Sequence, residues 1–399
     1  MMDTNLTSEN ILETILPKDA DEAILIGRVW IENGANSGPR VVRVCTDGVY
    51  DLTDLEPTCS ELMKLENVAS LVREFGKNKR IEDTQTILAN TFSNTSHRFL
   101  SPIDLQAVKA CGVTFAKSML ERVIEERAGG DPQKAMEIRA SLSDTIGQDI
   151  GQIKPGSNTA NKLKVALQEK GYWSQYLEVG IGPDAEVFTK APVLSSVGIG
   201  ADVGIHPGSS WNNPEPEAIV IVNSDGTIVG ATLGNDVNLR DFEGRSALLL
   251  GKAKDNNASA AIGPFIRLFD EKFTLADLEQ EVINLSVKGE DGFELNDFSS
   301  MSEISRSPSD LVSQTINRNH QYPDGIALYM GTMFAPTKDR GEPGSGFTHA
   351  PGDQVTISSD RLGALVNKVT YSNKAAEWKF GIFDLYRNLA ERGLLTGKG

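Results

Sequence analysis

Short apolar runs separated by glycine- and asparagine-rich turns dominate the first hundred residues of the chain. Their β-branched and aromatic side chains are typical of strands. These runs lie at residues 23–31, 40–44 and 48–52. The pattern returns from residue 176 onward, with apolar runs at 218–222 and 353–357 and two helical interruptions at 275–285 and 307–317. The chain is therefore predicted to have a small strand-rich start and a larger strand-rich end.

The stretch between these two segments has a helical pattern. Ser101 is a good N-cap, Pro102 suits a first helical turn, and Asp104 completes a capping box. Apolar side chains then recur at helical spacing. They are Val108, Cys111, Phe115, Met119 and Val123. Two further helices are predicted at residues 132–148 and 162–169.

These patterns predict three units in an α+β, β-rich fold. Residues 1–100 form a small β-rich N-terminal domain, residues 101–175 a helical connector, and residues 176–399 the main domain. A chain of 399 residues is long enough for two or three such units.

Charge and composition exclude some classes of partner. The chain has 39 Lys and Arg against 55 Asp and Glu, a formal charge of −16, which disfavours binding to nucleic acid. No window approaches the roughly 20 apolar residues of a spanning helix, so no membrane partner is expected. Three cysteines without a CxxC pair indicate a reducing, cytoplasmic location. Cys111 is expected to be a small buried hydrophobe.

The most informative local signal is the pair Asp225-Gly226 between two apolar runs, which predicts a β-hairpin. With these two residues at the centre of the loop, Ser224 faces Thr227 across the hairpin. The same register then places Glu215 opposite Asp236.

Glu217 lies on the same strand face as Glu215, because side chains alternate with a period of two. The hairpin therefore brings three carboxylates together: Glu215, Glu217 and Asp236. Such a cluster repels itself unless a cation or a proton neutralises it. Oxygen ligands without His or Cys indicate a hard divalent ion, Mg²⁺, Mn²⁺ or Ca²⁺. The alternative is that both glutamates are solvated residues on an edge strand next to prolines.

Several motifs resemble the metal-binding core of the fumarylacetoacetate hydrolase superfamily. They are P-E-P-E at 214–217, G-N-D-V-N-L-R-D at 234–241, Lys254 ten residues before Pro264, F-T-K-A-P at 188–192, Gly331-Thr332, and P-G-D at 351–353. In that family the E-x-E pair and the Asp of the second motif hold Mg²⁺, and the Lys reaches into the site. The resemblance covers roughly residues 100–367 and implies that 176–399 is a fumarylacetoacetate hydrolase-like mixed β-roll catalytic domain.

Membership in this superfamily indicates the metal more firmly than the reaction. Hydrolytic members use a His–Glu pair on an N-Y-x-x-H-x-x-E helix. The matching segment here, residues 114–121, keeps Glu121 but has Ser118 in place of the His. A serine has no pKa near neutrality with which to activate water, which disfavours hydrolysis.

The remaining segments resemble the 2-keto-3-deoxy-D-xylonate and 2-keto-3-deoxy-D-arabinonate dehydratase branch, a group of hydro-lyases of non-phosphorylative pentose breakdown. They are residues 178–188, 206–213 and 254–259. The resemblance implies Mg²⁺-dependent dehydration of a 2-keto-3-deoxy-D-pentonate to 2,5-dioxopentanoate. It assigns Glu186 as the base and Lys254 as the group that orients or protonates. The structural alternatives are an ion pair of Glu186 with Lys190 and a surface position for Lys254.

Substrate contacts are expected from polar side chains in the same loops. They are Ser209, Ser210, Asn212, Arg240 and Thr332. For each of them, a simple turn residue is the alternative. His206, His320 and His349 lack metal-ligand spacing and are expected to be structural or exposed.

Two other functions stay open at this point. One is a metal-dependent acylpyruvate or 2,4-diketo-acid hydrolase in which Glu121 activates water. The other is a non-catalytic sugar-acid-binding protein with the same fold. The resemblance also implies assembly as a homodimer or homotetramer.

Overall fold

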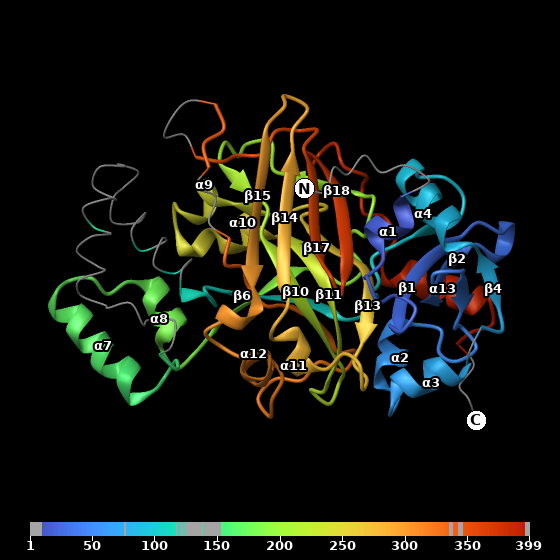
Figure 1. The fold of residues 1–399 in the computed structure, drawn as a ribbon, viewed down its shortest axis with the longest axis horizontal. Helices are drawn as coiled ribbons and strands as arrows, with labels where there is room; N and C mark the ends of the chain where they lie inside the picture. Colours follow the sequence, from blue (N-terminus) through green and yellow to red (C-terminus); the bar gives the residue numbers. More distant parts are fainter. Residues whose placement is uncertain are drawn as a thin grey trace.

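The computed structural model describes residues 10–75, 77–116, 119, 123, 138, 153–334, 338–341 and 346–395 (Figure 1). Its largest element is a mixed sheet that carries most of the strands. Their order across this sheet is β4 (Arg80–Glu82), β3 (Val49–Asp51), β2 (Gly38–Val44), β1 (Leu25–Ile31), β13 (Ala260–Leu268), β11 (Ile228–Asp236), β10 (Pro216–Val222), β16 (Ile326–Tyr329), β6 (Ala107–Gly112) and β7 (Glu186–Ala191), with β5 (Arg98–Phe99) beside β1.

A second, five-stranded sheet lies in front of β10, β11 and β13 in the view of Figure 1. Its order is β15 (Glu294–Ser300), β14 (Val282–Lys288), β17 (Gln354–Ser359), β18 (Gly363–Tyr371) and β8 (Asp202–Ile205). A short pair, β9 (Asn212–Asn213) and β12 (Asn238–Leu239), lies apart from both sheets. The α+β, β-rich fold class is confirmed.

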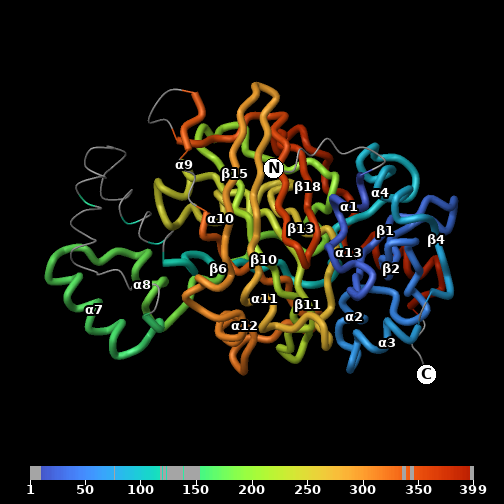
Figure 2. Tube along the Cα trace, viewed as in Figure 1, coloured from blue at the N-terminus to red at the C-terminus, as the bar shows by residue number. Residues whose placement is uncertain are grey.

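Helices surround these sheets. They are α1 (Ile11–Ile15), α2 (Cys59–Lys64), α3 (Val68–Phe75), α4 (Thr84–Ser93), α7 (Asn158–Glu169), α8 (Gln175–Ile181), α9 (Arg240–Glu243), α10 (Leu250–Lys254), α11 (Leu275–Leu278), α12 (Pro308–Thr315) and α13 (Ile382–Glu391). Figure 2 shows α7 and α8 at one end of the molecule and α2, α3 and α13 at the other. None of the helices in the described ranges is long and apolar enough to span a membrane.

The core explains why residues 218–222 of β10 are a continuous apolar run. Every residue of β10 is buried, and alternate side chains join different clusters. Ala218, Val220 and Val222 belong to the cluster that also contains residues of the second sheet, whereas Ile219 and Ile221 pack with the cluster on the other face. A strand covered on both faces loses the alternation of polar and apolar positions. This buried strand is the rigid support for the carboxylates that precede and begin it.

The N-terminal strands continue the main sheet, because β1 pairs antiparallel with β13. The C-terminal helix α13 lies among these elements (Figure 1). Asn388 donates a hydrogen bond to the carbonyl of Ser37 at 2.6 Å, and Arg392 donates to that of Pro39 at 2.8 Å. Strands β1 to β3 confirm the first three predicted runs, but α1 to α4 show that this region is not made of strands alone. The three-unit division stays a prediction.

The helix predicted from Ser101 is wrong through residue 112. Residues 107–112 form β6, which pairs parallel with β16 and antiparallel with β7. Asp104 does cap a helix, but a different one: its carboxylate accepts from the backbone N–H groups of Cys59 at 2.6 Å and Ser60 at 3.0 Å, at the start of α2. A capping side chain can accept hydrogen bonds from the first N–H groups of any helix within reach, so the motif alone does not identify the helix that it caps.

The other predicted helices have mixed outcomes. Helix α12 lies within the predicted 307–317, and α7 contains the predicted 162–169. The predicted helix at 275–285 ends after one turn at Leu278, because residues 282–288 join the second sheet as β14. The helix predicted at 132–148 lies, except for Ile138, outside the described residues.

Asp104 gives a stability prediction. Its carboxylate and the Arg28 guanidinium are both buried, with 3.5 Å between Asp104 Oδ2 and Arg28 Nε. Asp104→Ala leaves the buried Arg28 guanidinium without its carboxylate and the first two N–H groups of α2 without their acceptor, while Thr58 still caps this helix at Glu61. We therefore expect the free energy of unfolding to fall by about 3–5 kcal/mol. Urea unfolding measures this change.

Asp54→Ala is the matched control, because Asp54 and its partner Lys79 are both more than half exposed. This variant should change the free energy of unfolding by less than about 1 kcal/mol. Equal stability of the two variants would contradict a structural role for Asp104.

Candidate metal centre and active-site cavity

The hairpin of β10 and β11 has the predicted register from Pro216 to Ile221. Glu217 pairs with Gly234, Pro216 pairs with Asn235, and the N–H of Asp236 donates to the carbonyl of Glu215 at 3.1 Å. Glu215 and Asp236 are therefore opposite each other, as predicted.

The predicted turn, by contrast, is wrong by one residue. Asn223, not Ser224, faces Thr227, with the N–H of Asn223 donating to the carbonyl of Thr227 at 3.0 Å. A register shift between Ile221 and Val222 then restores the predicted pairing further along the strands. The longer loop and this irregularity compensate each other, so the carboxylates still meet.

Glu215, Glu217 and Asp236 form one buried cluster. Each offers a carboxylate oxygen, and these oxygens all lie within 4.8 Å of one another. The three residues are 5%, 1% and 1% exposed, so water screens their repulsion little. The Glu217 carboxylate also accepts from the backbone N–H of Gly331 at 2.6 Å, which orients it.

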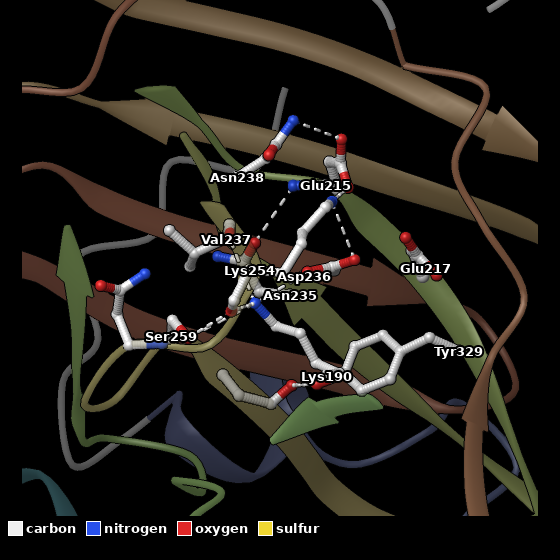
Figure 3. Close-up of polar contacts among 12 residues, drawn as sticks. Lys190, Glu215, Glu217, Asn235, Asp236, Val237, Asn238, Lys254, Ser259 and Tyr329 are labelled. Carbon is white, nitrogen blue, oxygen red and sulfur yellow. Dashed lines mark hydrogen bonds and ion pairs between the residues drawn. The ribbon is translucent and has the colours of Figure 1, made fainter. Parts of the chain in front are cut away.

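Two buried lysines contact this cluster (Figure 3). Lys254 at the end of α10 binds Glu215 and lies 3.0 Å from Asp236 Oδ2. Lys190 of β7 is fully buried, and its Nζ lies 2.8 Å from Asp236 Oδ1. Lys190 also donates to the carbonyls of Val237, at 3.1 Å, and Lys254. Two ammonium groups against three carboxylates leave one formal negative charge in the cluster.

The pKa shifts follow this arrangement. Burial raises the pKa of Glu217 well above its ordinary value, and the neighbouring Asp236 and Glu215 carboxylates raise it further. Burial would also raise the pKa of Asp236, but Lys190 and Lys254 hold it below its ordinary value. Burial opposes the charged form of Lys254, yet Asp236 and Glu215 raise its pKa. The cluster is thus short of positive charge at Glu217, the carboxylate that neither lysine contacts.

The donor set fits a hard divalent cation. All three groups are carboxylates, and their oxygens converge. The two lysines neutralise two of the three negative charges, so one further positive charge is needed. Mg²⁺, Mn²⁺ and Ca²⁺ prefer such oxygen ligands. The edge-strand alternative for Glu215 and Glu217 is wrong, because both are buried and β10 is an interior strand.

A cavity opens at this cluster. Besides the three carboxylates, it is lined by Cys111, Gly112, Val113, Glu186, Phe188, Glu243, Leu250, Lys254, Gly331, Thr332 and Phe334. The predicted residues Glu186, Lys254 and Thr332 are thus brought together with the predicted metal ligands. Lys254 is buried, which rules out a surface position.

The carboxylate of Glu186 lies against Gly112 of β6 at the cavity. A Cβ atom added to Gly112 would lie 2.0 Å from Glu186 Oε2, so the absence of a side chain on β6 makes room for this carboxylate. Lys190 lies further along β7, and its ammonium group contacts Asp236. The alternative prediction, an ion pair between Glu186 and Lys190, does not account for this contact.

Four of the predicted substrate-binding residues lie away from the cavity lining. Ser209 donates to the Asp241 carboxylate at 2.7 Å and accepts from Asn212 at 3.2 Å, while the N–H of Ser210 donates to the same Asp241 carboxylate at 2.9 Å. The Arg240 guanidinium lies 4.4 Å from the centre of the Trp211 ring. These contacts order the loop beside the site, and a direct role in binding stays a prediction.

The histidines have no metal-ligand arrangement in the described ranges. His349 is buried with its Nδ1 3.0 Å from Asp353 Oδ2, and His206 lies 3.3 Å from the Lys252 ammonium. Cys111 is buried as predicted, although on a strand, and burial raises its thiol pKa well above its ordinary value. Ser118 and Glu121 lie outside the described residues.

Sequence reasoning missed Lys190 and Glu243 as parts of the site. Alternation along β7 is the signal for Lys190, because residues 186, 188 and 190 share one face and Glu186 was already assigned to the site. No comparable signal marks Glu243. Its place in the cavity depends on a turn of helix after β12.

Comparisons with known proteins confirm the resemblance. Residues 214–370 match the family model of the fumarylacetoacetate (FAA) hydrolase C-terminal domain. A probable 2-keto-3-deoxyxylonate dehydratase from Haloferax volcanii is 26% identical over 337 residues, which cover 84% of this chain and 97% of that protein. A 2-dehydro-3-deoxy-D-arabinonate dehydratase from Saccharolobus solfataricus is 30% identical over 189 residues, 47% of this chain and 60% of that protein.

Solved structures share the fold. A 2-keto-3-deoxy-D-arabinonate dehydratase complexed with magnesium and 2,5-dioxopentanoate superposes with a TM-score of 0.60 at 20% identity, covering 87% of this chain and 99% of that one. A fumarylacetoacetate hydrolase from Exiguobacterium antarcticum superposes with a TM-score of 0.52 at 16% identity, covering 88% of this chain and 100% of that one. The predicted fumarylacetoacetate hydrolase-like fold is thereby confirmed.

The carboxylate cluster gives a binding prediction. Glu215→Ala removes one of three convergent oxygen ligands, so we expect Mg²⁺ binding measured by isothermal titration calorimetry to weaken by at least about 100-fold. Glu294→Ala removes an exposed carboxylate of β15 and should bind Mg²⁺ like the unaltered protein. Unchanged Mg²⁺ affinity in Glu215→Ala would rule out the proposed ligand set.

The buried lysine gives a second prediction. Lys190→Met keeps a long apolar side chain but removes the ammonium group that contacts Asp236 Oδ1 and donates to the Val237 carbonyl. We expect a loss of about 3 kcal/mol in the free energy of unfolding without metal. The control is Lys368→Met, an exposed lysine paired with an exposed Glu290. Denaturant unfolding of both variants measures the difference, and a loss no larger than the control would mean that Lys190 does not stabilise the cluster.

Proposed function

We propose that this chain, whose residues 214–370 belong to the fumarylacetoacetate hydrolase family, dehydrates a 2-keto-3-deoxy-D-pentonate to 2,5-dioxopentanoate with a divalent cation. The supporting observation is one buried cavity that brings a three-carboxylate cluster together with Lys254 and Glu186. Two relatives with matching sequence are named as dehydratases of such 2-keto sugar acids, and a solved structure of the same fold is a complex with magnesium and that product.

The residues of the cluster would hold the cation. Glu215, Glu217 and Asp236 would ligate Mg²⁺, which when bound supplies a Lewis acid for the C1 carboxylate and C2 carbonyl of a 2-keto acid. Lys254 and Lys190 neutralise part of the cluster and keep Asp236 ionised. The remaining shortage of positive charge is what attracts a cation into a buried position.

Proton transfer is assigned to Glu186 and Lys254. The overall reaction removes a C3 proton and the C4 hydroxyl as water and leaves a C3–C4 double bond. A hydrogen then moves from C5 to C3, and the resulting C4–C5 enol ketonises to 2,5-dioxopentanoate. Glu186 lies on the cavity wall outside the cluster, where a carboxylate can accept the C3 proton. Lys254 stays protonated beside the cluster and can orient the substrate or donate a proton.

The cavity suits a small substrate. It is built from β6, β7, the β10–β11 hairpin, α9, α10 and the segment after β16, and apolar side chains of Val113, Phe188, Leu250 and Phe334 form part of its wall. Such a mixed wall with a few convergent polar groups is typical of small-molecule sites. The homodimer or homotetramer and the cytoplasmic location stay predictions.

The test is a turnover assay with purified protein, Mg²⁺ and either 2-keto-3-deoxy-D-xylonate or 2-keto-3-deoxy-D-arabinonate. Formation of 2,5-dioxopentanoate is followed with a coupled dehydrogenase, and EDTA should abolish it. The acylpyruvate hydrolase alternative predicts pyruvate release from acylpyruvates instead. A protein that binds these sugar acids without turning over any of them would be the non-catalytic alternative.

Glu186→Gln tests the assigned base. The amide cannot accept a proton, so we expect kcat to fall by about 10²–10⁴-fold while Mg²⁺ affinity is retained. Gly112→Ala is a companion variant, because its methyl group displaces the Glu186 carboxylate and should lower kcat in the same direction. Steady-state kinetics and calorimetry measure both effects, and an unchanged kcat in Glu186→Gln would exclude Glu186 as the base.

A further inference from the structure

We infer that Thr114 is a positioning residue of the metal centre. Its hydroxyl group orients the peptide bond between Met330 and Gly331, and the N–H of that peptide orients the carboxylate of Glu217. Thr114 is not among the residues that line the cavity, so it acts through Glu217. The inference rests on the metal binding in the proposed function, and it holds whichever 2-keto acid is the substrate.

One peptide bond contacts both residues. Thr114 Oγ1 donates to the carbonyl of Met330 at 2.6 Å, and the N–H of Gly331 donates to Glu217 Oε2 at 2.6 Å. This carbonyl and this N–H belong to the same peptide. Because a peptide bond is planar, the directions of its C=O and N–H groups are fixed relative to each other. A hydrogen bond that holds the carbonyl therefore also sets the direction in which the N–H points.

Gly331 makes the orientation of this peptide depend on its partners. Its φ angle is +87°, in the region that favours glycine, and a Cβ atom added there would lie 2.0 Å from Thr114 Oγ1. The absence of a side chain therefore lets the hydroxyl group approach the backbone. A glycine also restricts its own backbone less than other residues do. The hydroxyl group thus supplies a restraint that the local backbone does not.

Thr114 has a well-defined position from which to act. It is 1% exposed and lies two residues after β6. Its carbonyl accepts from the N–H of Ser305 at 2.8 Å and from the Ser305 hydroxyl at 2.7 Å. The next residue, Phe115, forms a β-bridge with Ile304. These contacts fix the backbone of Thr114, and a β-branched side chain has few χ1 rotamers. The hydroxyl group is therefore preorganised towards the Met330 carbonyl.

Glu217 differs from the other two ligands in how it is oriented. Lys254 contacts Glu215 and Asp236, and Lys190 contacts Asp236. The carboxylate of Glu217 is instead oriented by a backbone N–H. Removal of a group that hydrogen-bonds to a metal ligand typically lowers metal affinity by about 10- to 100-fold. A change in the direction of this N–H should therefore weaken cation binding.

Thr114→Val tests the role of the hydroxyl group. Valine has the shape of threonine but cannot donate to the Met330 carbonyl. We expect the Mg²⁺ affinity of the full chain, measured by isothermal titration calorimetry, to fall by about tenfold. Thr114→Ser keeps the hydroxyl group and should bind Mg²⁺ within about twofold of the unaltered protein. This rescue separates the hydrogen bond from the packing of the side chain.

Thr84→Val is the matched control. Thr84 is also 1% exposed, and its Oγ1 also donates to a backbone carbonyl, that of Cys45, at 2.6 Å. It begins α4 and is not among the residues that line the cavity. Both valine variants lose a buried hydrogen bond, so urea unfolding should show similar losses of stability. Thr84→Val should nevertheless bind Mg²⁺ like the unaltered protein.

Three results would overturn the inference: an unchanged Mg²⁺ affinity in Thr114→Val, an equal loss of affinity in Thr84→Val, or no recovery in Thr114→Ser. If Thr114→Val does not fold, Thr114→Ala takes its place, with the same fall expected and an unchanged affinity again contradicting the role.

The proposed function fails separately. If the 2-keto-3-deoxy-D-pentonates are not dehydrated but the Mg²⁺ affinity follows the Thr114 hydroxyl group, the dehydratase assignment is wrong and the positioning role stands. If the unaltered protein does not bind Mg²⁺, the metal centre and the positioning role both fail.

Discussion

The mutual repulsion of three buried carboxylates is the constraint on which the site depends. Glu215, Glu217 and Asp236 have oxygens within 4.8 Å of one another and are almost inaccessible to solvent. A cluster of this kind is stable only if positive charge reaches it from other parts of the fold. Strand β7 and helix α10 each supply a lysine, and the remaining negative charge leaves a place for a divalent cation.

This constraint also organises the surroundings of the cavity. Lys190 binds the backbone of Val237 and Lys254 as well as Asp236, so one side chain ties β7 to the hairpin and to the end of α10. Asn238 connects Glu215 to Glu243 in a similar way. The same contacts that stabilise the charges therefore also hold Glu243 at the cavity lining.

Local sequence predicted the hairpin and its carboxylates well, and failed where distant segments compete. The predicted register of β10 and β11 is correct, because β10 is buried on both faces and this burial permits one pairing. The predicted turn is wrong, and the register shift between Ile221 and Val222 absorbs the extra loop residue. The capping motif at residues 101–104 was read as a helix start. Asp104 instead caps α2, some 45 residues earlier in the chain. Helical spacing in residues 108–123 was overridden by pairing of β6 with β16 and β7.

The sequence by itself determined the chemistry of the ligands, the β-rich class of the fold and, through alternation and turn residues, the meeting of Glu215, Glu217 and Asp236. These properties depend on residue type and on contacts close along the chain. Only the tertiary structure decided that Lys190 belongs to the cluster, that Arg240 turns to Trp211, and that Glu243 reaches the cavity. Each of these positions depends on how separate elements pack, and no local pattern encodes the direction of a side chain across that distance.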